Sequence, residues 1–67
     1  MSRFLITGGS GFIGTNLCEY LYDKGMIFKN IDLADPKVDR QKKNWEKIDI
    51  QEYEELRKVM LSFKPDI

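Results

Sequence analysis

The 67-residue sequence predicts an α/β protein, the first part of a doubly wound parallel sheet. A short apolar run is followed directly by a glycine-rich turn and then by a stretch with helical spacing of apolar residues. A second apolar run then ends in an aspartate. Such alternation of strand, helix and strand implies parallel strands with right-handed crossovers. The expected order is β-α-β-β-α, followed by the start of a fourth strand.

Composition narrows the class of protein. The chain is 42% hydrophobic and 33% charged, which is ordinary for a globular domain, and its formal net charge is zero. A balanced charge removes the general attraction to nucleic acids or membrane surfaces, so neither partner is expected. With one cysteine, Cys18, and no histidine, the chain has no internal disulfide and no Cys/His metal set. The first apolar run is too short for a signal peptide, and we expect a cytoplasmic protein.

The first strand and helix flank the glycine turn. Residues 3–7 form a short β-rich apolar run that stops at Gly8. From Phe12 to Lys24 apolar residues recur every three to four positions, and Gly25 is a typical helix stop. The expected apolar positions of this helix are Ile13, Leu17, Tyr20 and Leu21.

The middle of the chain contains two further strands and a polar loop. Residues 26–31 predict a second strand that ends at Asp32. The segment from there through Lys43 is polar and charged, and we expect a solvated loop rather than a nucleic-acid-binding patch. Residues 45–48 predict a short third strand.

The second helix is the clearest element of the pattern. Asp49 and Glu52 have the spacing of an acidic capping box, and Pro65 ends the helix. Asp66 and Ile67 resemble the opening of a fourth strand. Because that strand would cover this helix, we expect an incompletely covered helix and interpret residues 1–67 as the N-terminal portion of a larger domain. The apolar stripe predicted for the helix is Ile50, Tyr53, Leu56, Met60 and Phe63.

A glycine motif lies between the first strand and the first helix. Residues 9–14 satisfy G-x-G-x-x-G, and Gly8, Gly11 and Gly14 also satisfy G-x-x-G-x-x-G. A tight turn after a strand, with a bare backbone and a helix N-terminus, is what a pyrophosphate requires. The position of the motif between a strand and a helix favours a dinucleotide site over a flexible loop without a ligand.

Asp32 is the candidate ribose anchor. It follows Gly11 and Gly14 by about 20 residues, the spacing of the carboxylate that binds the adenosine ribose. A carboxylate accepts both ribose hydroxyls but repels a 2′-phosphate, which favours NAD over NADP. Lys37 and Arg40 could reach a 2′-phosphate and keep NADP as the less favoured cofactor. A purely turn-forming aspartate is the alternative.

The segment from Thr7 to Gly14 resembles the extended short-chain dehydrogenase/reductase family, the NAD-dependent sugar epimerases and dehydratases. Asp32 matches the ribose-binding acid of that family, and residues 63–67 resemble the lead-in to its fourth strand. The resemblance implies a Rossmann-like sheet. It also implies that Asp49 and the Ile50 backbone lie beside the adenine, and that the N–H groups of Phe12 and Ile13 face the pyrophosphate.

The resemblance also implies where catalysis occurs. The family uses a Ser or Thr with a Tyr-x-x-x-Lys pair, which would lie beyond residue 67. Tyr20 and Lys24 match the pair by spacing, but they end the first helix, away from the reactive end of the cofactor. We therefore expect no catalytic residue in this chain and interpret it as the NAD-binding segment, inactive alone, of a nucleotide-sugar epimerase, dehydratase or reductase.

Partners and alternatives follow from the same interpretation. The parent protein would bind a nucleotide sugar and could be a homo-oligomer. A non-catalytic dinucleotide-binding regulatory module is the alternative function. A flavin-binding protein is disfavoured by the resemblance at Asp49 and Ile50.

Overall fold

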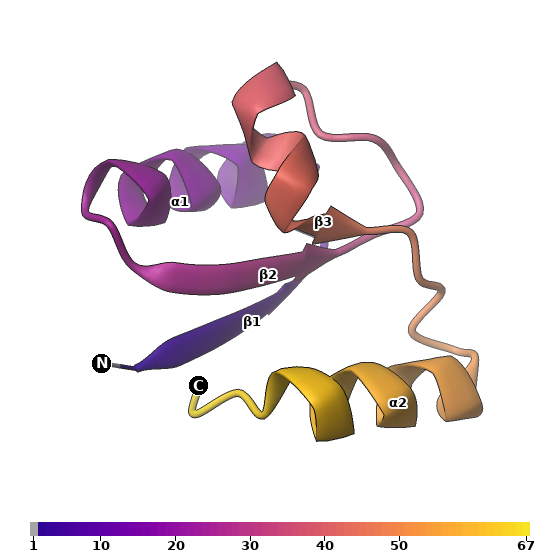
Figure 1. Ribbon diagram of the computed structural model, residues 1–67. Helices are drawn as coiled ribbons and strands as arrows, with labels where there is room; N and C mark the ends of the chain where they lie inside the picture. The colour runs from indigo at the N-terminus through magenta and orange to yellow at the C-terminus, as the bar shows by residue number, and fades with distance from the viewer. Residues whose placement is uncertain (1) are drawn as a thin grey trace.

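The computed structural model describes residues 2–67 as a parallel sheet with helices on both faces (Figure 1). Strand β2 lies between β1 and β3, and both neighbours are parallel to it. Helices α1 and η1 lie on one face of the sheet and α2 lies on the other (Figure 1). The predicted α/β class with a doubly wound parallel sheet is confirmed. The elements are β1 (Arg3–Thr7), α1 (Phe12–Asp23), β2 (Ile27–Ile31), the 3-10 helix η1 (Asp39–Asn44), β3 (Trp45–Glu46) and α2 (Tyr53–Phe63).

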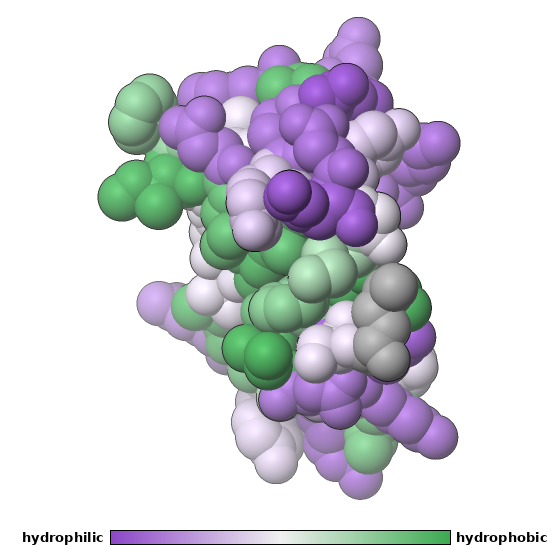
Figure 2. Space-filling model, turned by 90° about the vertical axis from the view of Figure 1, so that its left-hand side faces the viewer, coloured by the Kyte–Doolittle hydropathy of each residue, from purple (hydrophilic) through white to green (hydrophobic). Residues whose placement is uncertain are grey.

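The sheet divides the apolar core into two clusters, because successive side chains of a strand point to opposite faces. Phe4 and Ile6 of β1 pack against the α1 side, whereas Leu5 packs against the α2 side. In the view of Figure 2, apolar surface lies between the polar upper and lower parts of the molecule. The buried members are Cys18, Leu21 and Phe28 in the first cluster and Ile31, Ile48, Val59 and Phe63 in the second.

The start of a fourth strand lies along the free edge of β1. The N–H of Ile67 donates to the carbonyl of Arg3 at 3.2 Å, and the N–H of Leu5 donates to the carbonyl of Ile67 at 2.8 Å. One residue bonded in this way to both i−1 and i+1 of its neighbour is the parallel ladder pattern. The predicted fourth strand therefore begins beside β1, on the edge that β2 does not occupy.

The buried face of α1 differs from the predicted one. Ile13, Leu17 and Tyr20 are exposed, whereas Cys18 and Leu21 are buried. The face toward the sheet is formed by Cys18 and Leu21, which pack against Phe28, and the apolar periodicity did not reveal it because it did not include Cys18. Only Leu21 of the four predicted apolar positions lies in the core.

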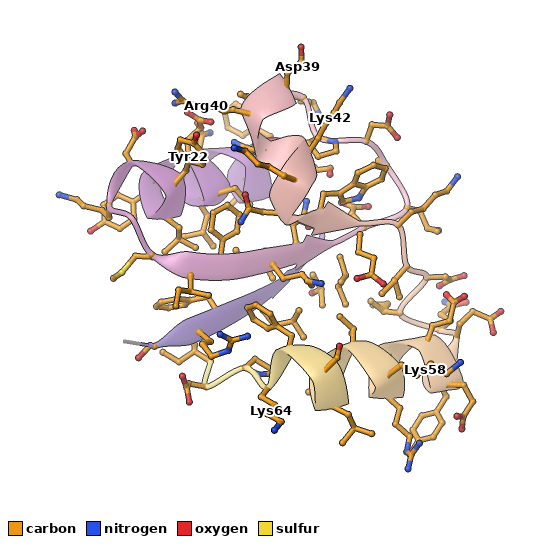
Figure 3. All side chains as sticks on the ribbon, viewed as in Figure 1. Tyr22, Asp39, Arg40, Lys42, Lys58 and Lys64 are labelled. Atoms are coloured by element: carbon orange, nitrogen blue, oxygen red, sulfur yellow. The ribbon has the colours of Figure 1, made fainter. Side chains whose placement is uncertain are left out.

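The segment after β2 is mostly exposed, as expected, but it is not a structureless loop. Six of its residues form η1, and the Gln41 side chain is 1% exposed beneath that turn. Its Nε2 donates to the Thr15 carbonyl and to Glu19 of α1. Figure 3 shows Arg40 beside Tyr22, where its guanidinium also donates to Glu19. The segment is solvated as expected over most of its length, but the prediction missed η1 and the burial of Gln41, whose Nε2 finds partners in α1 far away in sequence.

The beginning of α2 also differs from the prediction. The prediction of a capping box is wrong. Glu52 is the N-cap, its side chain makes no capping hydrogen bond, and the helix begins at Tyr53. Asp49 instead forms a turn in which its Oδ1 accepts the Gln51 N–H at 2.9 Å. Strand β3 ends at Glu46, two residues before the predicted end.

Helix α2 packs on the sheet through a face that only partly matches the prediction. Val59 and Phe63 are buried, and Leu56 packs against them. Three members of the predicted stripe, Ile50, Tyr53 and Met60, are exposed, and Ile50 precedes the helix rather than belonging to it. The helix is thus incompletely covered, as expected: Ile31 and Ile48 cover its inner face, while apolar side chains on its other faces stay exposed.

Candidate functional site

The glycine turn after β1 is fixed by its own hydrogen bonds. The Gly9 N–H donates to Asn30 Oδ1 at 2.8 Å, and the Ser10 N–H donates to Asp32 Oδ2 at 3.0 Å. The Gly11 N–H donates to the Gly8 carbonyl at 3.1 Å. These three successive donors have partners inside the protein, so the shape of the turn does not depend on a ligand.

The first donors that remain available belong to α1. Gly11 is the N-cap and no side chain caps the helix. The first intrahelical bond runs from the Thr15 N–H to the Gly11 carbonyl at 2.8 Å. The N–H groups of the three preceding residues, Phe12, Ile13 and Gly14, therefore point out of the helix N-terminus, where the dipole favours an anion. The side chains of Phe12 and Ile13 are both 81% exposed and leave this end of the helix open.

Glycine occupies positions 8, 11 and 14 of the spaced motif for different structural reasons. A Cβ at Gly14 would lie 2.5 Å from both the Gly8 carbonyl oxygen and the Gly9 Cα, so the close approach of helix to turn requires glycine. Gly8 has φ +71°, in the left-handed region. A Cβ at Gly11 would meet only the Gly8 carbonyl oxygen, at 3.5 Å, an ordinary contact. The fold itself therefore does not require glycine at position 11.

A pocket of about 180 Å³ opens at the carboxyl ends of the three strands. This edge is where ligands bind in doubly wound sheets. Four predicted site residues line it, namely Gly8, Asp32, Asp49 and Ile50. The structure thus brings together residues from the ends of all three strands. Ile31, Leu33 and Ile48 complete the walls.

The two pocket carboxylates retain acceptor capacity. Asp32 Oδ2 accepts the Ser10 N–H, and its Oδ1 accepts the Ala34 N–H at 3.1 Å. A carboxylate has about four acceptor positions, so about two remain. Asp49 Oδ1 accepts the Gln51 N–H, and within residues 2–67 its Oδ2 has no hydrogen-bond partner. Both groups can accept further donors from a ligand.

Asn30 and Ser10 are site residues that the sequence analysis missed. Both are 1% exposed, and Asn30 Nδ2 donates to Ser10 Oγ at 3.2 Å. A signal was present, because Asn30 is polar inside an apolar strand and lies two positions before Asp32. Because side chains alternate along a strand, Asn30 and Asp32 point to the same face. Both side chains accept N–H groups of the glycine turn.

The two cations named as possible 2′-phosphate ligands have different surroundings. Arg40 pairs with Glu19 and Asp23 on the outer side of α1. Its hydrogen bond to Glu19 lowers the pKa of that carboxyl and raises the pKa of the guanidinium. Lys37 Nζ instead donates to the Ser10 carbonyl at 2.8 Å and lies at the glycine turn.

Three side chains in or next to α1, those of Cys18, Tyr20 and Lys24, do not line the pocket. Cys18 is buried, and this burial raises the pKa of its thiol, which disfavours the reactive thiolate. Tyr20 and Lys24 lie at the C-terminal end of α1, and Lys24 Nζ is 5.7 Å from the Tyr20 ring centre. This is the end of the helix opposite the glycine turn.

A parallel sheet with a glycine turn at a helix N-terminus is typical of nucleotide-binding α/β proteins. The family model described as "NAD dependent epimerase/dehydratase family" matches residues 4–67, and the chain belongs to this family. Membership implies a nicotinamide dinucleotide cofactor. No curated protein matches the chain. Among the helices of residues 2–67, none has the length and apolar character needed to cross a membrane.

Proposed function

We propose that this chain forms the part of a longer nucleotide-sugar epimerase, dehydratase or reductase that binds the adenosine and pyrophosphate of NAD. The observation that carries the proposal is one juxtaposition. The open N-terminus of α1 and the carboxylates of Asp32 and Asp49 lie at the same edge of the sheet. A dinucleotide presents a diphosphate and, beside it, hydroxyl and amino donors, which this arrangement matches.

The residues present fit such a cofactor. The N–H groups of Phe12 and Ile13 would bind the pyrophosphate, and the absent Cβ at Gly11 would let it approach the backbone. The free acceptor positions of Asp32 suit the two ribose hydroxyls. The apolar walls at Ile48 and Ile50 suit the faces of a purine, with the unpartnered oxygen of Asp49 available to its amino group.

When bound, NAD would supply hydride-transfer chemistry, which in an epimerase means a hydride removed from a sugar carbon and returned within one turnover. The residues of this chain bind and orient the cofactor. The acid–base pair and the sugar site belong to the remainder of the enzyme, so residues 1–67 alone would have no activity. A cytoplasmic location and a homo-oligomeric state of the complete enzyme are part of the proposal.

The test is NAD binding by the complete protein, measured calorimetrically, with Gly11→Ala and Gly11→Val as a graded series. The native backbone at Gly11 is extended (φ −78°, ψ −177°), so both variants are expected to fold. NAD affinity should fall in Gly11→Ala and fall further, by at least about 10-fold relative to wild type, in Gly11→Val. The added side chain would occupy the space of the phosphate. Unchanged affinity in a folded Gly11→Val protein would contradict the assignment.

Turnover of nucleotide sugars by the same protein separates an enzyme from a regulatory module. NAD binding together with interconversion or dehydration of a nucleotide sugar supports the proposal. NAD binding without turnover of any nucleotide sugar supports the non-catalytic alternative.

A further inference from the structure

Asp32 is held through its backbone as well as through its carboxylate. Its N–H donates to the Glu46 carbonyl at 3.3 Å. Its carbonyl accepts the indole N–H of Trp45 at 3.0 Å. The carboxylate accepts the N–H groups of Ser10 and Ala34. Every polar group of this residue therefore has a partner, and the partner of its carbonyl is a side chain.

The Trp45 indole takes the place of a bond that the sheet lacks. In a parallel ladder, the bond that follows the one from Asp32 to Glu46 would run from the Ile48 N–H to the Asp32 carbonyl. Strand β3 ends at Glu46, and no such bond forms within residues 2–67. Without the indole, the backbone of Asp32 would be bonded to β3 through its N–H alone.

Trp45 acts on the pocket from outside it. It begins β3, where it is the register partner of Asn30 in β2, and it is not one of the residues that line the pocket. The carbonyl that it holds belongs to the peptide bond between Asp32 and Leu33, and both of these residues line the pocket. Trp45 can therefore affect a ligand in this pocket only through the residues that it positions.

We propose that Trp45 is a positioning residue for the adenosine ribose of NAD, because its indole N–H holds the backbone from which the Asp32 carboxylate reaches the ribose hydroxyls. The inference rests on the proposed function. A short side chain such as aspartate follows its backbone closely, so fixing the peptide fixes the direction of the carboxylate. An acceptor that is ordered before the ligand arrives loses less conformational entropy on binding.

The experiment measures NAD affinity of the complete protein by calorimetry for wild type, Trp45→Phe and the matched control Asn44→Leu. Phenylalanine keeps an aromatic ring and removes the indole N–H. Asn44 Nδ2 donates to the Phe28 carbonyl at 3.1 Å, so the control also removes a bond from a side chain to the β2 backbone, at a residue that does not line the pocket. NAD affinity should fall about 3- to 10-fold in Trp45→Phe and change by less than about 2-fold in Asn44→Leu.

Combination with Asp32→Ala separates positioning of the carboxylate from a general effect on the shape of the pocket. In the Asp32→Ala protein no carboxylate remains to be positioned, so adding Trp45→Phe should change NAD affinity by less than about 2-fold. Equal losses in the two backgrounds would overturn the proposal. An unchanged NAD affinity in Trp45→Phe alone would overturn it as well.

The wild-type protein provides a measurement that does not depend on the folding of a variant. The assigned indole N–H signal of Trp45 in NMR spectra should shift when NAD saturates the protein, because the ribose binds the residue that accepts this hydrogen bond. An indole signal that stays unchanged at saturating NAD would contradict the positioning role. Failure of the wild type to bind NAD would instead contradict the proposed function.

Discussion

Asn30 accepts the N–H of Gly9 through its Oδ1 at 2.8 Å, although the two residues are 21 positions apart. The amide also donates to Ser10 Oγ, so the buried carboxamide satisfies two groups of the glycine turn at once. A Cβ at Gly9 would lie 2.3 Å from the same Oδ1, which shows how closely strand β2 approaches the turn. The turn is therefore preorganised from beneath by β2, and binding a ligand need not order it.

The first prediction concerns this contact. Asn30→Ala leaves the buried Gly9 N–H without a partner, and we expect a loss of about 1–3 kcal/mol in the free energy of unfolding. NAD affinity should fall too, because the turn is no longer held. Denaturant unfolding of the complete protein measures the loss. Asn16→Ala, on the exposed face of α1, is the control and should stay within about 0.5 kcal/mol of wild type.

The glycines provide a second prediction. In Gly14→Ala the new methyl meets backbone atoms at 2.5 Å, so the helix must move away from the turn and the protein should lose about 1–3 kcal/mol of stability. In Gly11→Ala the nearest atom is 3.5 Å away, and the loss should be about 1 kcal/mol at most. Thermal unfolding of the two variants without cofactor makes the comparison. Equal destabilisation would contradict the different roles of these glycines.

Cofactor preference is the third prediction, and it depends on Asp32. NAD should bind more tightly than NADP by about 1–3 kcal/mol, because the carboxylate gains ribose hydrogen bonds and repels a 2′-phosphate. Asp32→Ala should narrow the difference by weakening NAD and relieving the repulsion. Parallel titrations measure both effects. A wild-type preference for NADP would show that Asp32 does not set the choice.

The fourth prediction is a pH dependence at the contact between α1 and η1. Hydrogen bonds from Arg40 and then Gln41 lower the pKa of Glu19 from its ordinary value of 4.5. A carboxyl with a lowered pKa contributes stability that is complete above that ordinary value and is lost as the pH falls through the lowered one. The Gln41 side-chain amide signals, followed by NMR, should therefore shift in acid. The step should disappear in Glu19→Gln.

The fifth prediction concerns residues 1–67 expressed alone. Among residues 2–67 the buried apolar core comprises seven residues, and Tyr53, Met60 and Leu61 leave apolar surface exposed on α2. A domain of this size with an exposed apolar surface should be weakly stable or self-associating. Circular dichroism with sedimentation tests this. A sharp cooperative transition from a dilute monomer would contradict it.

Local sequence signals were sufficient for the elements around the glycine turn. The run before Gly8 and the stop at Gly25 predicted β1 and the end of α1 correctly, since turn geometry and apolar runs act over a few residues. The position of Asp32 beside the pocket followed from spacing alone. Its role, like that of the other site residues, stays a prediction.

Features that depend on distant contacts were missed. Gln41 becomes buried because α1 offers it partners 22 and 26 residues away, and no local pattern in a polar segment shows this. Asp49 had the spacing of a helix cap, but the chain must first turn beneath the pocket, so the carboxylate closes a turn instead. In both places tertiary packing decided between local structures that the sequence alone permits.

The position of Ile48 and Ile50 has a consequence for motion. These pocket walls belong to the connection between β3 and α2, and α2 is anchored through the cluster of Ile31, Val59 and Phe63, separately from α1. Local unfolding of α2 would therefore remove one wall of the pocket while the glycine turn stays intact. A ligand that contacts both the glycine turn and the wall formed by Ile48 and Ile50 binds only the folded form of α2. Binding therefore suppresses the local unfolding of this helix. Amide hydrogens of α2 would then exchange more slowly in the bound state, and the far side of the sheet would report occupancy of the pocket.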